Sequence, residues 1–236
     1  MGGKPEMRFT ALLKKELREA LPWIALVLIA ILLIGSLTIH NEQKHQWSQG
    51  AHNVKAGSSP NLRNLNMRQP LYEMGPLVIT LSIALAVALG ITQFLLPFFQ
   101  RNWAYTIHRS VNRTTILLSK FTAAAIAMVL GIGVIWTLFY LYACQPGKFP
   151  FPPPKHVLTD GWLFILMAMV VYFATALTSV STTKWYTTRV FPLVFTLFVY
   201  IIALSNQTPL SLAIIALIAA AGFCVQIVHT FTNREF

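Results

Sequence analysis

Acidic residues are scarce in this chain of 236 residues, which holds seven Asp and Glu against eighteen Lys and Arg. Charged residues make up only 11% of the sequence, whereas a soluble domain carries about 25%. The hydrophobic share is 56%, and the apolar residues fall in runs too long for a soluble core. These proportions exclude an ordinary soluble domain. In a membrane protein the excess of positive charge indicates basic cytoplasmic loops rather than nucleic-acid binding.

Cysteines and catalytic motifs are equally sparse. Cys144 and Cys224 fall at opposite ends of predicted membrane spans, which excludes a disulfide between them. The sequence contains no phosphate-binding loop, no H-E-x-x-H and no G-x-S-x-G motif, and its six histidines lack zinc-type spacing. We therefore predict no catalytic residue, no metal site and no cofactor, and we expect that the chain does not hydrolyse nucleotide by itself.

Six apolar stretches are long enough to cross a hydrocarbon core of about 30 Å, which takes about 20 helical residues. The last two are parted by only three polar residues, and they must form a hairpin because one helix over both would be about twice too long. The fifth stretch is short, so a partly re-entrant segment stays open as an alternative for it. The predicted fold is all-α: a polytopic membrane protein with six transmembrane helices in one domain, residues 21–236. The spans are predicted at residues 21–39, 76–99, 121–143, 161–183, 190–205 and 209–228.

The loop charges predict the orientation of these spans. Twelve Lys and Arg fall on the side of both termini, and six fall on the other side. Because basic loops stay in the cytoplasm, we expect an integral membrane protein whose N- and C-termini are both inside.

Residues 1–20 are predicted to form an N-terminal tail and a short amphipathic helix in the cytoplasmic interface. Apolar residues recur at helical spacing, and cations that would face anionic lipid headgroups cover the other side. A basic flank that only sets topology explains the charges equally well, but it does not explain the apolar stripe. The residues expected in this interfacial helix are Phe9, Leu13, Lys14, Lys15, Leu17 and Arg18.

The segment between the second and third spans, residues 100–120, carries four cations and no acid, with aromatic and hydroxyl residues between them. A loop that only sets topology does not need aromatic side chains. We interpret it as a basic, partly helical docking element for a soluble partner. Its candidate contact residues are Trp103, Tyr105, Thr106, His108, Arg109, Ser110, Asn112, Arg113 and Lys120.

Two short phrases carry a family resemblance. Residues 110–120 read S-V-N-R-T-T-I-L-L-S-K, and residues 12–18 read L-L-K-K-E-L-R. In these phrases and in its predicted architecture the chain resembles the permease subunits of type II ABC exporters, the ABC-2-type membrane proteins. Their corresponding phrases are P-V-S-R-x-x-I-L-L-G-K, in a coupling loop, and L-x-K-K-E-L-R, in an N-terminal elbow helix. Ser110 stands where the family usually has proline.

The resemblance implies that ATP hydrolysis and transport are carried out by different subunits. A separate ABC ATPase subunit would dock on the 100–120 loop, and a second copy or a paralogue would complete a permease dimer in the bacterial inner membrane. An apolar lining suits a lipid, a drug or a hydrophobic peptide as substrate. Two alternatives stay open, because fold alone does not settle function: a non-transporting scaffold or assembly subunit of a larger membrane complex, and a small integral-membrane enzyme.

Overall fold

The computed structural model describes residues 5–55, 71, 74–99, 112–149, 152–181, 190–205 and 209–233. Every regular element in these ranges is a helix, so the described part of the chain is all-α, as the sequence predicts. The helices are α1 (Pro5–Lys55), α2 (Met74–Gly90), η1 (Ile91–Leu95), α3 (Leu96–Phe99), α5 (Arg113–Met128), η2 (Val129–Gly133), α6 (Val134–Ala143), α7 (Lys155–Val180), α8 (Phe191–Ser205) and α9 (Pro209–Asn233).

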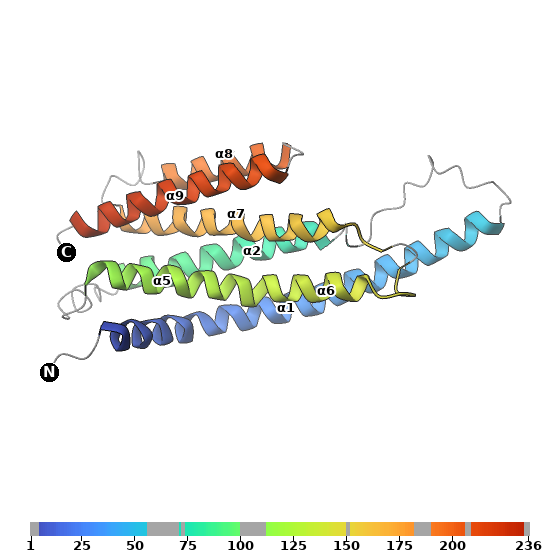
Figure 1. The fold of residues 1–236 in the computed structure, drawn as a ribbon, viewed down its shortest axis with the longest axis horizontal. Helices are drawn as coiled ribbons and strands as arrows, with labels where there is room; N and C mark the ends of the chain where they lie inside the picture. Colours follow the sequence, from blue (N-terminus) through green and yellow to red (C-terminus); the bar gives the residue numbers. More distant parts are fainter. Residues whose placement is uncertain are drawn as a thin grey trace.

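The helices lie side by side in an elongated bundle (Figure 1). The π-helical turns η1 and η2 continue their neighbours without a break, so α2 to α3 is one rod and α5 to α6 is another. α7 lies at the centre, in contact with α2, α8 and α9, while α1 packs on α5 and α2. We call the end of the bundle that holds the start of α1 and the end of α9 the proximal end, and the opposite end the distal end.

Within the described ranges, five helical segments are long and apolar enough to cross a membrane, which makes the chain an integral membrane protein. They are Phe9–Lys44, Met74–Leu95, Arg113–Ala143, Lys155–Val180 and Pro209–Thr232. The segment predicted as the fifth of six spans forms α8, an apolar helix of 15 residues. Its rise of about 22 Å is shorter than a hydrocarbon core of about 30 Å.

The first helix differs from the sequence prediction. We expected an interfacial helix that ends before a new span begins at Leu21, but α1 runs unbroken through Pro22 to Lys55. Residues 11–20 are strong helix formers and include no glycine or asparagine to end the helix. The predicted boundary near residue 20 is therefore absent. The inward face of this segment, which includes Glu16 and Ala20, is buried, and Glu16 contacts α5.

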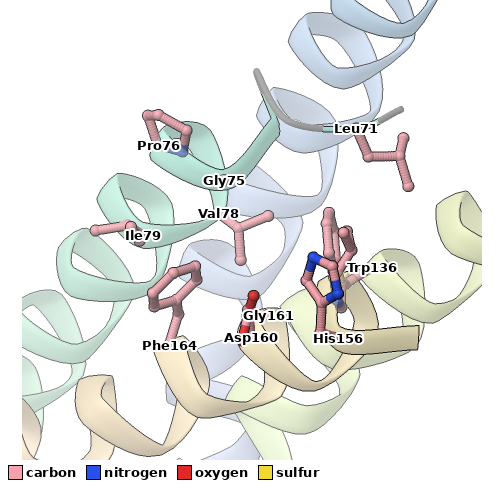
Figure 2. Close-up of a pocket in the computed structure, with 11 residues that line it drawn as sticks. Leu71, Gly75, Pro76, Val78, Ile79, Trp136, His156, Asp160, Gly161 and Phe164 are labelled. Atoms are coloured by element: carbon pink, nitrogen blue, oxygen red, sulfur yellow. The ribbon is translucent and has the colours of Figure 1, made fainter. Parts of the chain in front are cut away.

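A cavity of about 400 Å³ opens at the distal end, between the first turns of α2 and α7 and the start of α6 (Figure 2). Polar contacts instead fill the space between helices near the proximal end. These two regions are the chemically distinctive parts of the described bundle, whose remaining core is an apolar cluster shared by α1, α2, α5, α6, α7 and α9.

Candidate functional site near the proximal end

The structure describes only part of the predicted docking loop. Asn112, Arg113 and Lys120 lie at the start of α5, which begins eight residues before the predicted third span. The last eight residues of the predicted loop therefore form the first two turns of a helix. The other candidate residues fall outside the described residues; they are Trp103, Tyr105, Thr106, His108, Arg109 and Ser110.

Asn112 sets the start of α5. Its backbone is extended, with φ −61° and ψ 135°, and its side-chain oxygen accepts a hydrogen bond from the Thr114 backbone N–H at 3.3 Å. This is the N-cap arrangement that satisfies one of the unpaired N–H groups of a first helical turn. The cap gives the basic segment a defined junction with the bundle.

Arg113 joins α5 to α9. Its Nη1 donates a hydrogen bond to the backbone carbonyl of Thr232 at 3.0 Å, in the last turn of α9. A cation at this position also interacts favourably with the negative end of the α9 helix dipole. The two helices are thus held together at their proximal ends.

Lys120 is buried rather than exposed to a partner. Its Nζ lies 2.8 Å from Glu16 Oε1, and the two side chains are only 6% and 4% exposed. The prediction that Lys120 is a docking-loop contact does not fit this geometry, because a desolvated ammonium needs the carboxylate beside it. The sequence analysis did not single out Glu16. The available signal was its position within the apolar stripe, three residues after Leu13 and four before Ala20.

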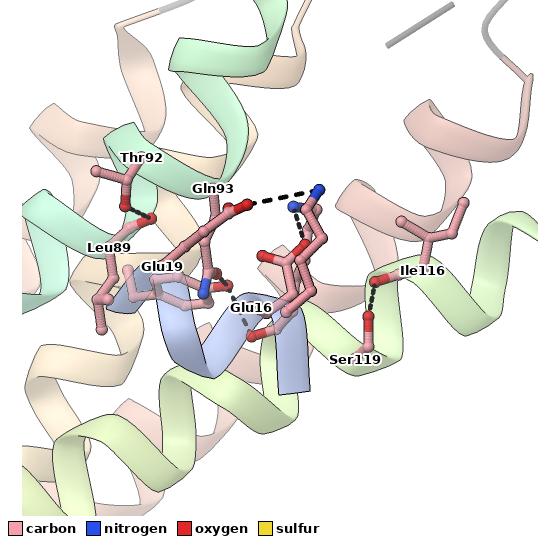
Figure 3. Close-up of polar contacts among 10 residues, drawn as sticks. Glu16, Glu19, Leu89, Thr92, Gln93, Ile116 and Ser119 are labelled. Atoms are coloured by element: carbon pink, nitrogen blue, oxygen red, sulfur yellow. Dashed lines mark hydrogen bonds and ion pairs between the residues drawn. The ribbon is translucent and has the colours of Figure 1, made fainter. Parts of the chain in front are cut away.

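A second buried contact adjoins this ion pair (Figure 3). The Tyr172 hydroxyl, on α7, donates to Gln93 Oε1 at 2.6 Å and lies 3.3 Å from the backbone carbonyl of Lys120. Gln93 belongs to the π-helical turn η1, and such turns are frequent at functional sites. The Lys120 Nζ also lies 5.6 Å from the centre of the Phe94 ring. Four elements therefore meet at one polar cluster: α1, η1, α5 and α7.

Two atoms of the cluster are buried without a hydrogen-bond partner in the described structure. They are Glu16 Oε2, an acceptor, and Gln93 Nε2, a donor. An unmatched buried polar atom costs about 1–3 kcal/mol, and partly satisfied networks are sensitive to small rearrangements. The cluster thus joins helices tightly while keeping one donor and one acceptor unused.

The predicted interfacial residues divide between two faces of α1. Lys14, Lys15 and Arg18 are exposed, and Lys15 lies 3.5 Å from Glu19 one turn later. The apolar members Phe9, Leu13 and Leu17 are half-buried on the side of the helix that includes buried Glu16. The start of α1 therefore has an exposed basic side and an apolar side that packs against the bundle.

Within the described ranges, no three His, Cys, Asp or Glu side chains gather where they could hold a metal ion. The donors and acceptors of the proximal cluster instead suit it to hold helices together and to exchange hydrogen bonds between them. Comparison of the chain with known protein families, curated proteins and solved structures finds no match.

Proposed function

We propose that this chain is the membrane subunit of a type II ATP-binding cassette exporter. A separate ATPase subunit docks on the loop of residues 100–120, and a second copy or a paralogue completes the permease. The proximal end faces the cytoplasm of a bacterial cell, and α8 forms, with α9, the hairpin that completes six membrane crossings. The transported molecule is a lipid, a drug or a hydrophobic peptide.

The observation that carries this proposal is the way α5 is tied at its proximal end. Arg113 contacts the end of α9, and Lys120 contacts Glu16 of α1. A force applied to the preceding basic loop therefore reaches α5 first and then two further helices. Rigid-body shifts of packed helices are a common way in which one subunit moves another.

The membrane-facing chemistry is consistent with an energy source outside the chain. Self-powered, ion-coupled transporters usually carry charged groups in their membrane segments. Among the charged groups inside the described helices, Glu16 and Lys120 neutralise one another. Glu42 accepts a hydrogen bond from the Leu71 backbone N–H, and Asp160 borders the distal cavity. An ATPase partner supplies the energy that such an arrangement does not provide.

Affinity purification in mild detergent from the native host tests the proposal. We expect a stoichiometric ATPase with nucleotide-binding motifs to co-purify, identified by mass spectrometry and by activity of the eluate. The double variant Arg101→Glu, Arg109→Glu should reduce this co-purification by about tenfold or more, because it reverses charge on the docking segment.

The matched control reverses two exposed cations on the other side, Lys44→Glu and Lys155→Glu, and should retain the ATPase. Co-purification of several membrane subunits without any ATPase would contradict the exporter proposal and would favour the scaffold alternative.

A further inference from the structure

The distal cavity has the size and lining of a small-molecule site. Its volume of about 400 Å³ lies within the range of about 300–1,000 Å³ that ligand pockets occupy, and its walls are mostly apolar, as is usual for such sites. Three separate parts of the chain meet around it. The principal wall residues are Leu71, Val78, Ile79, Trp136, Asp160 and Phe164.

The wall around Trp136 is preformed. The indole is 1% exposed, and its Nε1 donates to the backbone carbonyl of Leu158 at 3.3 Å. A Cβ at Gly161 would collide with the indole, so the absence of a side chain at Gly161 allows α6 and α7 to approach here. The ring is thereby fixed in place before any ligand arrives.

The wall at Leu71 is held from α1. The Leu71 backbone N–H donates to Glu42 Oε2 at 2.9 Å, and the Leu71 carbonyl accepts from the Met74 N–H at 3.1 Å. Leu71 adopts a positive φ of 68°, a conformation that a non-glycine residue rarely takes without compensating contacts. A cavity with such fixed walls avoids much of the ordering cost of ligand binding.

The ionisable groups among the lining residues are Asp160 and His156, one helical turn apart on α7. Asp160 is the only aspartate in the chain and is half-buried. Figure 2 shows the Asp160 and Phe164 side chains extending from α7 towards α2 across the cavity. A carboxylate in a mostly apolar wall forms stronger charge-assisted hydrogen bonds than it would in water.

The negative charge of the Asp160 carboxylate in the cavity wall favours a cationic ligand. Helix N-termini attract anions through their unpaired N–H groups, but the first turn of α2 offers few of them. Pro76 has no N–H, and the N–H of Met74 already donates to Leu71. The partly exposed Phe164 ring adds a surface that attracts cations.

We propose that this cavity binds a small amphipathic organic cation, whose apolar body lies among Val78, Ile79 and Phe164 and whose ammonium group pairs with Asp160. The site lies within a single chain at the distal end, and it does not depend on the exporter function or on an ATPase. A free hydrophobic amine and the amino headgroup of a phospholipid share this chemistry.

Three probes of matched shape test the proposal: 4-phenylbutylamine, 4-phenylbutanol and 4-phenylbutyrate. Binding to the full chain in phosphatidylcholine nanodiscs is measured by equilibrium dialysis, with empty nanodiscs subtracted. We expect the amine to bind about tenfold more tightly than the alcohol, as one charge-assisted hydrogen bond provides, and the carboxylate to bind most weakly.

Asp160→Asn should bring the amine and the alcohol to within about twofold of each other, since it removes the charge at nearly constant shape. His156→Gln is the matched control and should keep the preference for the amine. Ile79→Trp fills the cavity and should weaken all three probes together. Size-exclusion profiles show that each variant is folded.

Equal binding of amine and alcohol to the natural chain, or an unchanged preference in Asp160→Asn, would overturn the proposal. A further arm separates the two sources of the cation. Competition by phosphatidylethanolamine in the nanodiscs would support the proposal with a lipid headgroup as occupant, and binding unaffected by this lipid would support it with a free amine.

Discussion

The two ends of the bundle solve the problem of polar groups inside an apolar protein in opposite ways. Near the proximal end, Glu16 and Lys120 are almost completely buried and neutralise each other. At the distal end, Asp160 is half-buried and borders a cavity. The Glu16–Lys120 ion pair joins two helices. The Asp160 carboxylate instead faces a cavity that a ligand can enter.

The difference indicates that the proximal contacts stabilise the bundle and that the distal cavity is suited to binding a ligand. Truncating one partner of a buried ion pair leaves an uncompensated charge, so the proximal contacts are costly to lose. Substitutions that fill an open cavity or remove its charge are expected to change ligand affinity more than the free energy of unfolding. Three sets of variants measure how much each end contributes to stability.

The largest effect is expected from Lys120→Met. Loss of the ammonium leaves the buried Glu16 carboxylate unpaired, which should lower the free energy of unfolding by about 3–5 kcal/mol. The double variant Lys120→Met, Glu16→Leu should recover most of this loss, because an apolar pair avoids the desolvation of both charges. Reversible denaturant unfolding in detergent measures all variants.

Lys15→Met is the control for this prediction, since Lys15 and Glu19 are largely exposed and such pairs contribute less than about 1 kcal/mol. If the Lys120 variant unfolds no more easily than the Lys15 variant, the proximal cluster does not hold the helices together.

An intermediate effect is expected from Gly161→Ala at the distal end. The new methyl group would collide with the Trp136 indole, and overpacking of this kind costs about 1–3 kcal/mol. Gly75→Ala is the matched control because a Cβ there would meet no atom within 4 Å. It should be neutral or slightly stabilising. Similar melting temperatures for the two variants would contradict the close packing of α6 against α7.

The smallest change in the free energy of unfolding is expected from removing either partner of the Tyr172–Gln93 hydrogen bond. Tyr172→Phe removes the hydroxyl and leaves the Gln93 oxygen unpaired, at a cost of about 1–2 kcal/mol. Gln93→Leu should cost less, since Tyr172 can still donate to the Lys120 carbonyl and since Gln93 Nε2 has no partner to lose. The same unfolding measurement decides the order, and the reverse order would show that Gln93 has a further role.

Much of the fold could be predicted from the sequence because long apolar runs have few alternatives to helices in a membrane. The predicted spans at 76–99, 161–183 and 209–228 correspond to helices in the structure. The early start of α5 had a readable signal, since Asn112 is a favoured N-cap residue. The start of the first span was predicted wrongly, because α1 continues through Pro22 without a break.

The candidate sites were harder to predict because their residues are far apart in the chain. Glu16 and Lys120 each interrupt an apolar stripe, which signals burial, but 104 positions separate them and periodicity does not say which stripes meet. The distal cavity depends on the contact of Trp136 with Gly161 and on the turn at Leu71. Such details follow from tertiary packing and leave no local pattern in the sequence.

The unbroken course of α1 gives it a mechanical role that a helix interrupted at Pro22 would lack. Glu16 and Glu42 lie on the same rod, about 39 Å apart along its axis. The first holds α5 near the proximal end, and the second holds Leu71 beside the distal cavity. Both attachments therefore lie on one continuous helix, so the position of α1 fixes a contact at each end of the bundle.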